Sequence, residues 1–395
     1  MTVGDGTTAA AGAPGAAQER AAQGSAAPAG AGALATAAGS SAGAAAAARA
    51  LRTRRRLRTA LLASVFSLGG LTLLVLSVGV AITLGPADVS LVNVRDVVLN
   101  HVAQAQIPVR VSEDAIVWQE RLPRALVAAA CGAGLGLCGA IMQSLLRNPL
   151  ADPYVLGVSS GASTGAVATG VLGLGGAALG LSGGAFIGAL VAFALVLALS
   201  RMAGGGNDRV VLAGVASTQL FSALTSLVVF AFADSDETRG VMFWLLGSLE
   251  GVRWNDVGLC LAVVAAGTLI CLRYAFALDA FAFGDEVASS LGLNVRRVRL
   301  LLLLLTALMT ATLVSVAGAI GFVGLVLPHA ARLLFGSRHT RIVPATAVMG
   351  AVFMIWVDAG SRVAFAPTPL PVGVGTALIG VPVFIALLAR RRRTA

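Results

Sequence analysis

Residues 124–146 read RALVAAACGAGLGLCGAIMQSLL. After Arg124 this stretch has no charged residue, and a helix of about 20 apolar residues crosses a hydrocarbon core of roughly 30 Å. Gly132 and Gly136 have the G-x-x-x-G spacing that lets helix backbones approach closely in lipid. The stretch therefore predicts a membrane-spanning helix that packs tightly against a neighbour.

Similar apolar runs recur along the whole chain. Of the 395 residues, 57% are hydrophobic and only 12% charged, about half the charged fraction of an average soluble protein. The other candidate spans are residues 60–84, 154–172, 177–200, 210–233, 257–278, 343–365 and 370–389. The run between Arg299 and Arg332 could form one tilted helix, but two short helices broken near Gly318, Gly321 and Gly324 fit its length of about 48 Å better. The predicted fold class is an all-α polytopic membrane protein with about ten transmembrane helices.

The arginines predict the topology. The 28 basic residues are all arginine, and ten spans leave seven of them outside: Arg95, Arg110, Arg121, Arg124, Arg239, Arg253 and Arg362. The remaining 21 lie inside, as the positive-inside rule requires. We expect a cytoplasmic membrane protein with both termini inside. The basic residues punctuate apolar runs instead of forming one solvated face, so nucleic-acid binding is not expected.

Three domains are predicted. Residues 1–59 form a disordered Ala/Gly-rich cytoplasmic tail with a basic end, because they cannot bury enough apolar area to offset the entropy of ordering. Residues 60–390 form the ten-helix transmembrane domain, with an inside loop at 279–299. Residues 391–395 form a basic C-terminal tail.

Several chemistries are excluded by what the chain lacks. Without lysine it has no Walker A phosphate loop and no Schiff-base amine. The four cysteines lie inside apolar runs without C-x-x-C spacing, so neither a metal site nor a cofactor is expected. No titratable residue stands at the centre of a span. His329 is interpreted as a residue at a helix end near the membrane interface, and Asp358 and Arg362, four residues apart, as an ion pair.

Two loops are candidates for coupling to other proteins. Inside, residues 283–292 read FGDEVASSLG, which predicts a short helix with Asp285 and Glu286 in its first turn and Gly292 at its end. An acidic helix on an arginine-rich face suggests a protein partner; a plain solvated connector is the alternative. Outside, exposed Arg121 and Arg124 suit carboxylates of a docking partner, or extend to lipid phosphates.

The order of these motifs resembles the permease subunits of type II ABC importers, the FecCD-type family that takes up iron-siderophore complexes, haem and cobalamin. The resemblance rests on the following residues in sequence order: Arg121 to Arg124 (RLPR), Gln143, Asn148 and Pro149 (in RNPLA), Trp244, Gly247 and Ser248, Gly284 to Gly292, Gly321 and Gly324, Pro328 and His329, and Asp358 with Arg362. One departure is GSRHTR at residues 336–341, where the family often has G-x-D-H-R, which leaves the pairing of that inner loop open.

This resemblance implies the fold, partners and site residues. It implies a homodimer or heterodimer with a second permease subunit, two ATPase subunits, and an extracytoplasmic substrate-binding protein. By the same resemblance, the binding protein docks at Arg121, Arg124 and Arg362, and the ATPase couples through Gly284, Asp285, Glu286, Leu291 and Gly292. The chain is therefore expected to be a transport subunit and not an enzyme. Ferric siderophore is the expected substrate, haem or cobalamin the alternatives, and a stand-alone secondary transporter the rival mechanism.

Overall fold

The computed structural model describes residues 68–365 and 368–391, and the regular secondary structure within these residues is entirely helical. The tail predicted for residues 1–59 lies outside the described residues, as do residues 392–395. Each of the ten predicted spans corresponds to one helix: Leu68–Thr83, α4 (Leu122–Leu145), α5 (Val158–Gly170), α6 (Gly176–Met202), α7 (Asn207–Phe232), α9 (Trp254–Arg273), α12 (Val295–Ala317), α13 (Val323–Phe335), α14 (His339–Ala364) and α15 (Val372–Arg391). The predicted fold class is therefore confirmed.

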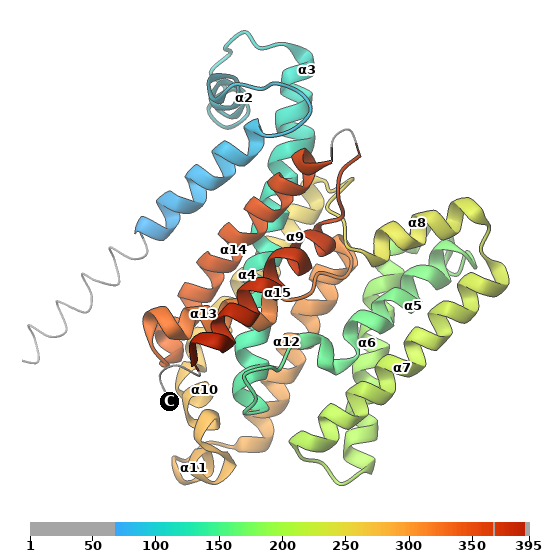
Figure 1. The fold of residues 1–395 in the computed structure, drawn as a ribbon, viewed down its shortest axis with the longest axis vertical. Coiled ribbons are helices and arrows are strands. Elements are labelled where there is room, and N and C mark those ends of the chain that lie inside the picture. Colours follow the sequence, from blue (N-terminus) through green and yellow to red (C-terminus); the bar gives the residue numbers. More distant parts are fainter. Residues whose placement is uncertain (1–67, 366–367, 392–395) are drawn as a thin grey trace, which may run out of the picture. The chain divides into compact units, whose positions relative to one another are not determined.

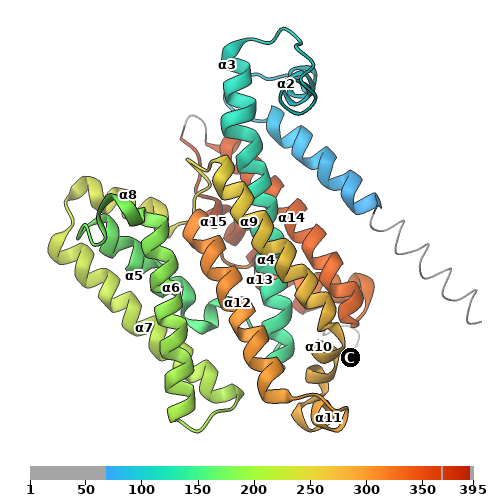
Figure 2. The same cartoon turned by 180° about the vertical axis from the view of Figure 1, so that it is seen from behind.

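Shorter helices connect the spans. They are α2 (Leu91–Ala103), α3 (Val111–Asp114), the π-helix η1 (Ala115–Arg121), the 3-10 helix η2 (Pro153–Leu156), α8 (Ser235–Leu245), α10 (Ala275–Phe283) and α11 (Asp285–Ser290). Figure 1 shows α2 and α3 at one end of the helix bundle and α11 at the other. We call these the α2 end and the α11 end. Seen from behind, α5, α6 and α7 form a group beside α12 (Figure 2).

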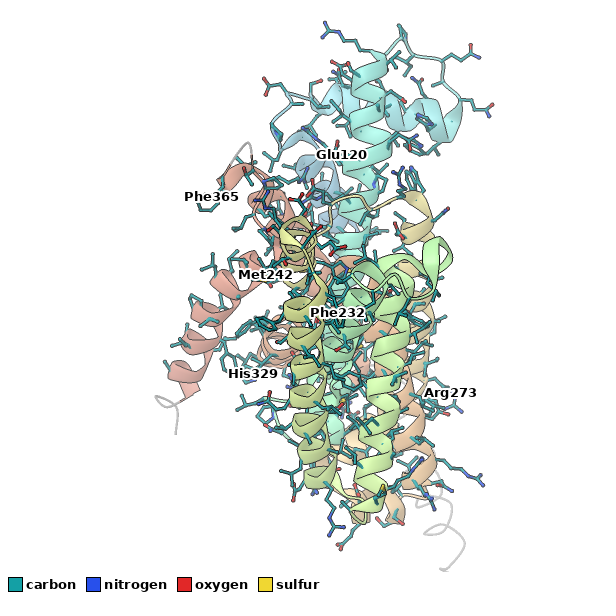
Figure 3. The ribbon with its side chains drawn as sticks, turned by 90° about the vertical axis from the view of Figure 1, so that its right-hand side faces the viewer. Glu120, Phe232, Met242, Arg273, His329 and Phe365 are labelled. Carbon is teal, nitrogen blue, oxygen red and sulfur yellow. The ribbon has the colours of Figure 1, made fainter. Side chains whose placement is uncertain are left out.

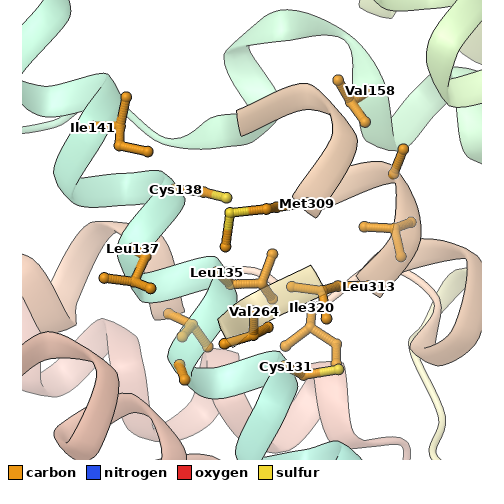
Figure 4. Close-up of a cluster of buried hydrophobic side chains, with 14 of the residues drawn as sticks. Cys131, Leu135, Leu137, Cys138, Ile141, Val158, Val264, Met309, Leu313 and Ile320 are labelled. Carbon is orange, nitrogen blue, oxygen red and sulfur yellow. The ribbon is translucent and has the colours of Figure 1, made fainter. Parts of the chain in front are cut away.

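Helix α4 is the centre of the bundle. In the helical stretch Val111–Leu145, which includes α4, 94% of the most apolar 18-residue segment is buried. Helix α4 packs against α9, α12, α13 and α14. Figure 4 shows part of this core, formed by Cys131, Leu135, Leu137, Cys138 and Ile141 of α4 with Val264, Met309, Leu313 and Ile320. The four cysteines are buried and unbridged, as small apolar groups are expected to be.

Two glycine contacts allow α4 to approach its neighbours. A Cβ on Gly132 would collide with the carbonyl oxygen of Gly350 in α14, and one on Gly139 would collide with the carbonyl oxygen of Gly324 in α13. Helices in lipid associate through such close packing, because lipid tails are as apolar as leucine. The G-x-x-x-G stretch therefore forms the predicted tight contact, with α14 as the partner at Gly132.

The chain between α12 and α13 is not helical. Gly318 has φ +68° and Phe322 has φ +67°, both in the left-handed region that few side chains adopt. The predicted break is confirmed, but only α13 is a short helix: α12 has 23 residues, enough for about 34 Å. Gly324 lies inside α13 and not in the break. We call residues 318–322 the helix break.

Candidate functional site

Three buried charges meet at the α2 end. Arg124 Nε lies 2.8 Å from Asp358 Oδ1, and Arg362 Nε lies 3.3 Å from Asp358 Oδ2. Asp358 is 1% exposed, and both arginines are 7% exposed. The predicted Asp358–Arg362 pair is confirmed. Arg124 is a third member that sequence reasoning missed, since it comes from α4, whereas the other two come from α14.

The arginines also bind the end of the first described helix. Arg121 donates from Nη1 to the Ile82 carbonyl and from Nη2 to the Ala87 carbonyl, each at 2.8 Å. Arg362 donates to the carbonyls of Ala81 and Leu84 at 2.9 and 3.0 Å. The last carbonyls of a helix lack partners within it and carry partial negative charge, so these guanidinium groups stabilise that end. We call Arg121, Arg124, Asp358 and Arg362 the arginine cluster.

A cavity of about 380 Å³ opens beside this cluster. Its lining includes Glu120, Arg124, Glu250, Arg253 and Arg362. Figure 3 shows Glu120 near the α2 end and Arg273 nearer the opposite end. Arg124 and Arg362 thus reach a space large enough for a partner's side chain, although both already contact Asp358. The expectation that Arg121 and Arg124 are exposed is wrong, because both are buried; Arg121 is 3% exposed and is not part of the lining.

Predicted motif residues converge on the helix break. A Cβ on Gly247 would collide with the Ala319 carbonyl, and one on Gly318 with the Trp244 carbonyl. The Ser248 N–H donates to the Ala317 carbonyl at 2.9 Å, and Tyr154 Oη bonds both the N–H and the carbonyl of Ile320 at 2.9 Å. The hydrogen bonds from Ser248 and Tyr154 satisfy backbone groups that a continuous helix would otherwise pair, which non-helical chain at membrane depth requires. Gly321 lies within the break.

An apolar cavity of about 610 Å³ borders the helix break. Its lining includes Leu245, Ala319, Gly373, Leu378 and Pro382. Irregular backbone within a membrane occurs where it is covered by protein or lines a cavity, and broken helices in transporters commonly mark the substrate route. The break and this cavity together are therefore the part of the described chain that best fits a solute path.

Gln143 replaces a hydrogen bond that Pro328 removes. Pro328 has no N–H to donate to the carbonyl four residues earlier, which is that of Gly324. Gln143 Nε2 donates to this carbonyl at 3.1 Å and to the Leu325 carbonyl at 3.2 Å. The motif residues Gln143, Gly324 and Pro328, far apart in sequence, thus form one contact between α4 and α13.

A second polar chain links three helices at the α11 end. Ser144 Oγ lies 2.7 Å from His339 Nε2, and His339 Nδ1 lies 2.6 Å from Asp279 Oδ1. Ser144 Oγ is also 3.0 Å from the Ala140 carbonyl, so the hydroxyl is engaged on both sides within the bundle. This chain ties α4 to α14 and α10, and sequence reasoning missed it.

Asp279 also replaces the cap that α14 lacks. Arg338, at the N-cap of α14, makes no side-chain capping bond. The His339 N–H instead donates to Asp279 Oδ1 at 2.9 Å. Burial acts to raise the pKa of Asp279, but the bonds from His339 and the charge of Arg338 outweigh it, so the pKa lies below its usual value. The pairing that the GSRHTR departure left open is therefore provided by another helix.

Helix α11 presents the predicted coupling residues. Gly284 caps it with φ +115°, Asp285 pairs with Arg299, and Glu286 is exposed. Phe283, Val287 and Leu291 are also exposed. Gly292, with φ +82°, follows the helix, so the predicted start, end and acidic first turn of this helix are confirmed.

Of the remaining predicted residues, Asn148 and Pro149 lie in the exposed turn after α4, where Asn148 Oδ1 accepts the Leu150 N–H at 2.9 Å. The interpretation of His329 as a helix-end residue is wrong, because it lies in the middle of α13, is 8% exposed and lines the cavity discussed below. The structure thus separates the predicted residues into the arginine cluster, the helix break and the α11 end.

Comparison with known proteins agrees with this arrangement. A model of the FecCD transport family matches residues 37–390. The chain belongs to the FecCD transport family. It is 40% identical over 330 residues to the cobalamin import system permease protein BtuC of Halobacterium salinarum, covering 82% of this chain and 88% of that protein. It is 35% identical over 333 residues to the iron(3+)-hydroxamate import system permease protein FhuB of Bacillus subtilis, covering 84% of each.

The fold agrees with a solved relative. A structure described as an inward-facing conformation of a metal-chelate type ABC transporter aligns with a TM-score of 0.72 and 28% identity, covering 82% of this chain and 99% of that one. The resemblance to the FecCD family that the motif order indicated is therefore confirmed.

The arginine cluster generates a stability prediction. Asp358→Asn should lower the free energy of unfolding by about 3 kcal/mol or more, because it leaves two buried arginines without a carboxylate. The matched control is Asp96→Asn, which removes the partner of the exposed Arg95 and should cost at most about 1 kcal/mol. Thermal unfolding of the purified protein in detergent measures both. Equal losses would show that the cluster contributes no more than a surface pair.

Asp279 generates a pH prediction. Its lowered folded-state pKa contributes stability that is fully present above the unfolded value of about 4 and is lost as pH falls through the folded value. Asp279→Asn should therefore destabilise the protein at pH 7 by about 1–2 kcal/mol. The difference in stability between Asp279→Asn and the unchanged protein, measured by thermal unfolding across pH, should disappear in acid. The control is the exposed Asp208→Asn; a difference that stays constant with pH contradicts the assignment.

Proposed function

We propose that this chain is the permease subunit of an ATP-driven type II ABC importer that carries ferric siderophore across the cytoplasmic membrane. The observation that carries the proposal is the family match over residues 37–390 together with the 35% identity to an iron(3+)-hydroxamate permease over 84% of both chains. Cobalamin is the second candidate substrate, since a cobalamin permease is 40% identical. Haem is the third candidate substrate, on the family resemblance alone.

The proposed orientation puts the α11 end in the cytoplasm. The helix ends and turns there carry Arg147, Arg201, Arg209, Arg273, Arg296, Arg297, Arg299, Arg332, Arg338 and Arg341, against seven arginines toward the α2 end. This excess is the pattern of a cytoplasmic face and supports the proposal that both termini lie inside.

The proposed energy source is a pair of ATPase subunits docked on α11. Phe283, Val287 and Leu291 expose apolar surface beside the carboxylate of Glu286. Exposed apolar groups rimmed by charge are typical of a protein interface. Asp285 acts differently, because its carboxylate is already paired with Arg299 and so holds α11 to the start of α12.

The proposed outer partner is a substrate-binding protein that docks at Arg121, Arg124 and Arg362. Arg124 and Arg362 line the cavity at the α2 end, where a partner's carboxylate would compete with Asp358 for the guanidinium groups. Arg121 supports this surface from beneath, through its bonds to the carbonyls of Ile82 and Ala87. The solute path lies along the helix break, and a second permease copy covers the apolar cavity beside it.

The substrate is tested by reconstitution. The chain, its ATPase and its binding protein in proteoliposomes should accumulate a radiolabelled iron-hydroxamate complex only when ATP is supplied, and excess cobalamin should not compete. If the proteoliposomes transport cobalamin and not the iron-hydroxamate complex, the substrate is cobalamin. Accumulation by the chain alone, against a gradient and without an ATPase, would overturn the ABC mechanism.

The coupling surface is tested by single substitutions in α11. Glu286→Ala should weaken co-purification of the ATPase by roughly three- to tenfold, with thermal unfolding unchanged, because this side chain makes no ion pair within the described chain. Asp285→Ala should lower both the co-purification of the ATPase and the thermal unfolding temperature, since it also breaks the ion pair with Arg299. Glu250→Ala, an exposed acid toward the α2 end, is the control. If all three variants bind the ATPase equally, α11 is not the docking element.

A further inference from the structure

A cavity of about 420 Å³ at the α11 end has no part in the transport cycle described above. It lies among the ends of α4 and α10, helix α13, and the turn into α14. Its lining consists of Gln143, Ser144, Arg147, Pro149, Ala282, His329, Arg332, Leu333, Ser337 and His339. No carboxylate is part of that lining, while two arginines and two histidines are.

The two arginines keep their charge available to a ligand. Within residues 68–365 and 368–391, neither Arg147 nor Arg332 lies within ion-pair distance of an acidic side chain. The acids nearby are engaged elsewhere, Asp279 with His339 and Asp285 with Arg299. Guanidinium groups bind phosphate oxygens through strong charge-assisted hydrogen bonds, so the lining favours an anion with several oxygen acceptors.

Gln143 indicates that the ligand also carries a hydrogen-bond donor. Its Nε2 donates to two carbonyls of α13, which fixes the amide orientation. Its Oε1 is buried and has no hydrogen-bond partner among the described residues, and the residue is 4% exposed at the cavity. A buried acceptor without a donor costs free energy. A ligand that carries hydroxyl groups as well as a phosphate would satisfy this oxygen.

Part of the rim of the cavity is apolar. Leu333 forms part of the lining and is 59% exposed, and Leu334 beside it is 68% exposed. Both lie in the last turns of α13, next to the arginine-rich end that the proposed orientation places at the cytoplasmic interface. A bound molecule here therefore meets basic groups on one side and a surface suited to acyl chains on the other.

We propose that this cavity binds the headgroup of an anionic phospholipid with a hydroxyl-bearing headgroup, of the phosphatidylglycerol class. Arg147 and Arg332 hold the phosphate, a headgroup hydroxyl donates to Gln143 Oε1, and an acyl chain lies along Leu333. Basic pockets between membrane helices on the cytoplasmic side bind lipid headgroups in this way. A free phosphate offers the same anionic chemistry but makes no use of the apolar rim.

The site adjoins the coupling helix. Arg147 Nη1 lies 3.5 Å from the position of a Cβ on Gly284, the residue that caps α11. A phosphate held by Arg147 would therefore fix a side chain that touches the start of the ATPase-coupling element. A carboxylate of the docked ATPase is the rival occupant, since it could reach the same arginines from the cytoplasm.

The test uses the full chain, purified and delipidated in detergent. Binding of phosphatidylglycerol, phosphatidylcholine and inorganic phosphate is measured by native mass spectrometry and by the shift in thermal unfolding. The test variants are Arg147→Gln, Arg332→Gln and their combination. The control combines Arg297→Gln with Arg341→Gln, which removes the same charge from exposed positions at the same end that do not line the cavity.

Phosphatidylglycerol should bind more tightly than phosphatidylcholine. Each single variant should weaken it about fivefold and the double variant about 30-fold, whereas the control should change it less than twofold. The single variants retain one arginine and so report on the site even if the double variant is unstable. Equal binding by the double variant and the control overturns the proposal.

Two further outcomes separate the possible occupants. If millimolar inorganic phosphate displaces the lipid and gives the same thermal shift, the site is one for free phosphate and the lipid assignment is wrong. If the assembled transporter with its ATPase retains no phosphatidylglycerol while the isolated chain does, the ATPase occupies the cavity and the proposal fails for the working complex. Retention that depends on Arg147 and Arg332 in both forms supports it.

Discussion

The close contact between α4 and α14 fixes the rest of the structure. At its middle, Gly132 and Gly350 bring the two backbones together with no room for a side chain. In lipid, this packing replaces the hydrophobic force that drives association in water. Because the backbones are this close, Arg124 meets Asp358 at one end of α4 and Ser144 meets His339 at the other. These polar contacts are separated by 20 residues of helix, about 30 Å.

The sequence predicts the elements well because each prediction depends on local information. Span length, the glycine-rich break and the Asp358–Arg362 pair all follow from spacing within one segment. The positive-inside rule gives the side on which Arg121 and Arg124 lie but not their depth. Burial of these two residues depends on the carbonyls of another helix, at Ile82 and Ala87, and on Asp358. No local pattern contains that information.

Two of the contacts between helices compensate for a group absent from the helix that they reach. Pro328 removes an N–H from α13, and Gln143 of α4 supplies the donor. α14 begins without a capping side chain, and Asp279 of α10 supplies the acceptor. In each case the local sequence shows only that a backbone group lacks its hydrogen-bond partner, not which residue replaces that partner. Motif residues distant in sequence therefore belong together because one satisfies the backbone group that another leaves unpaired.

The two ends of the bundle, for which we propose different partners, share one closely packed pair of helices, α4 and α14. A change of access between the ends then requires movement in elements outside the α4–α14 contact. The helix break is the suitable place, because residues 318–322 are not held by the regular bonds of a helix and Phe322 has an unfavourable φ. Trp244, Gly247 and Tyr154 hold its backbone through a few bonds and close contacts from neighbouring elements. A small number of alternative contacts there would change the proposed path while the proposed docking surfaces at both ends keep their geometry.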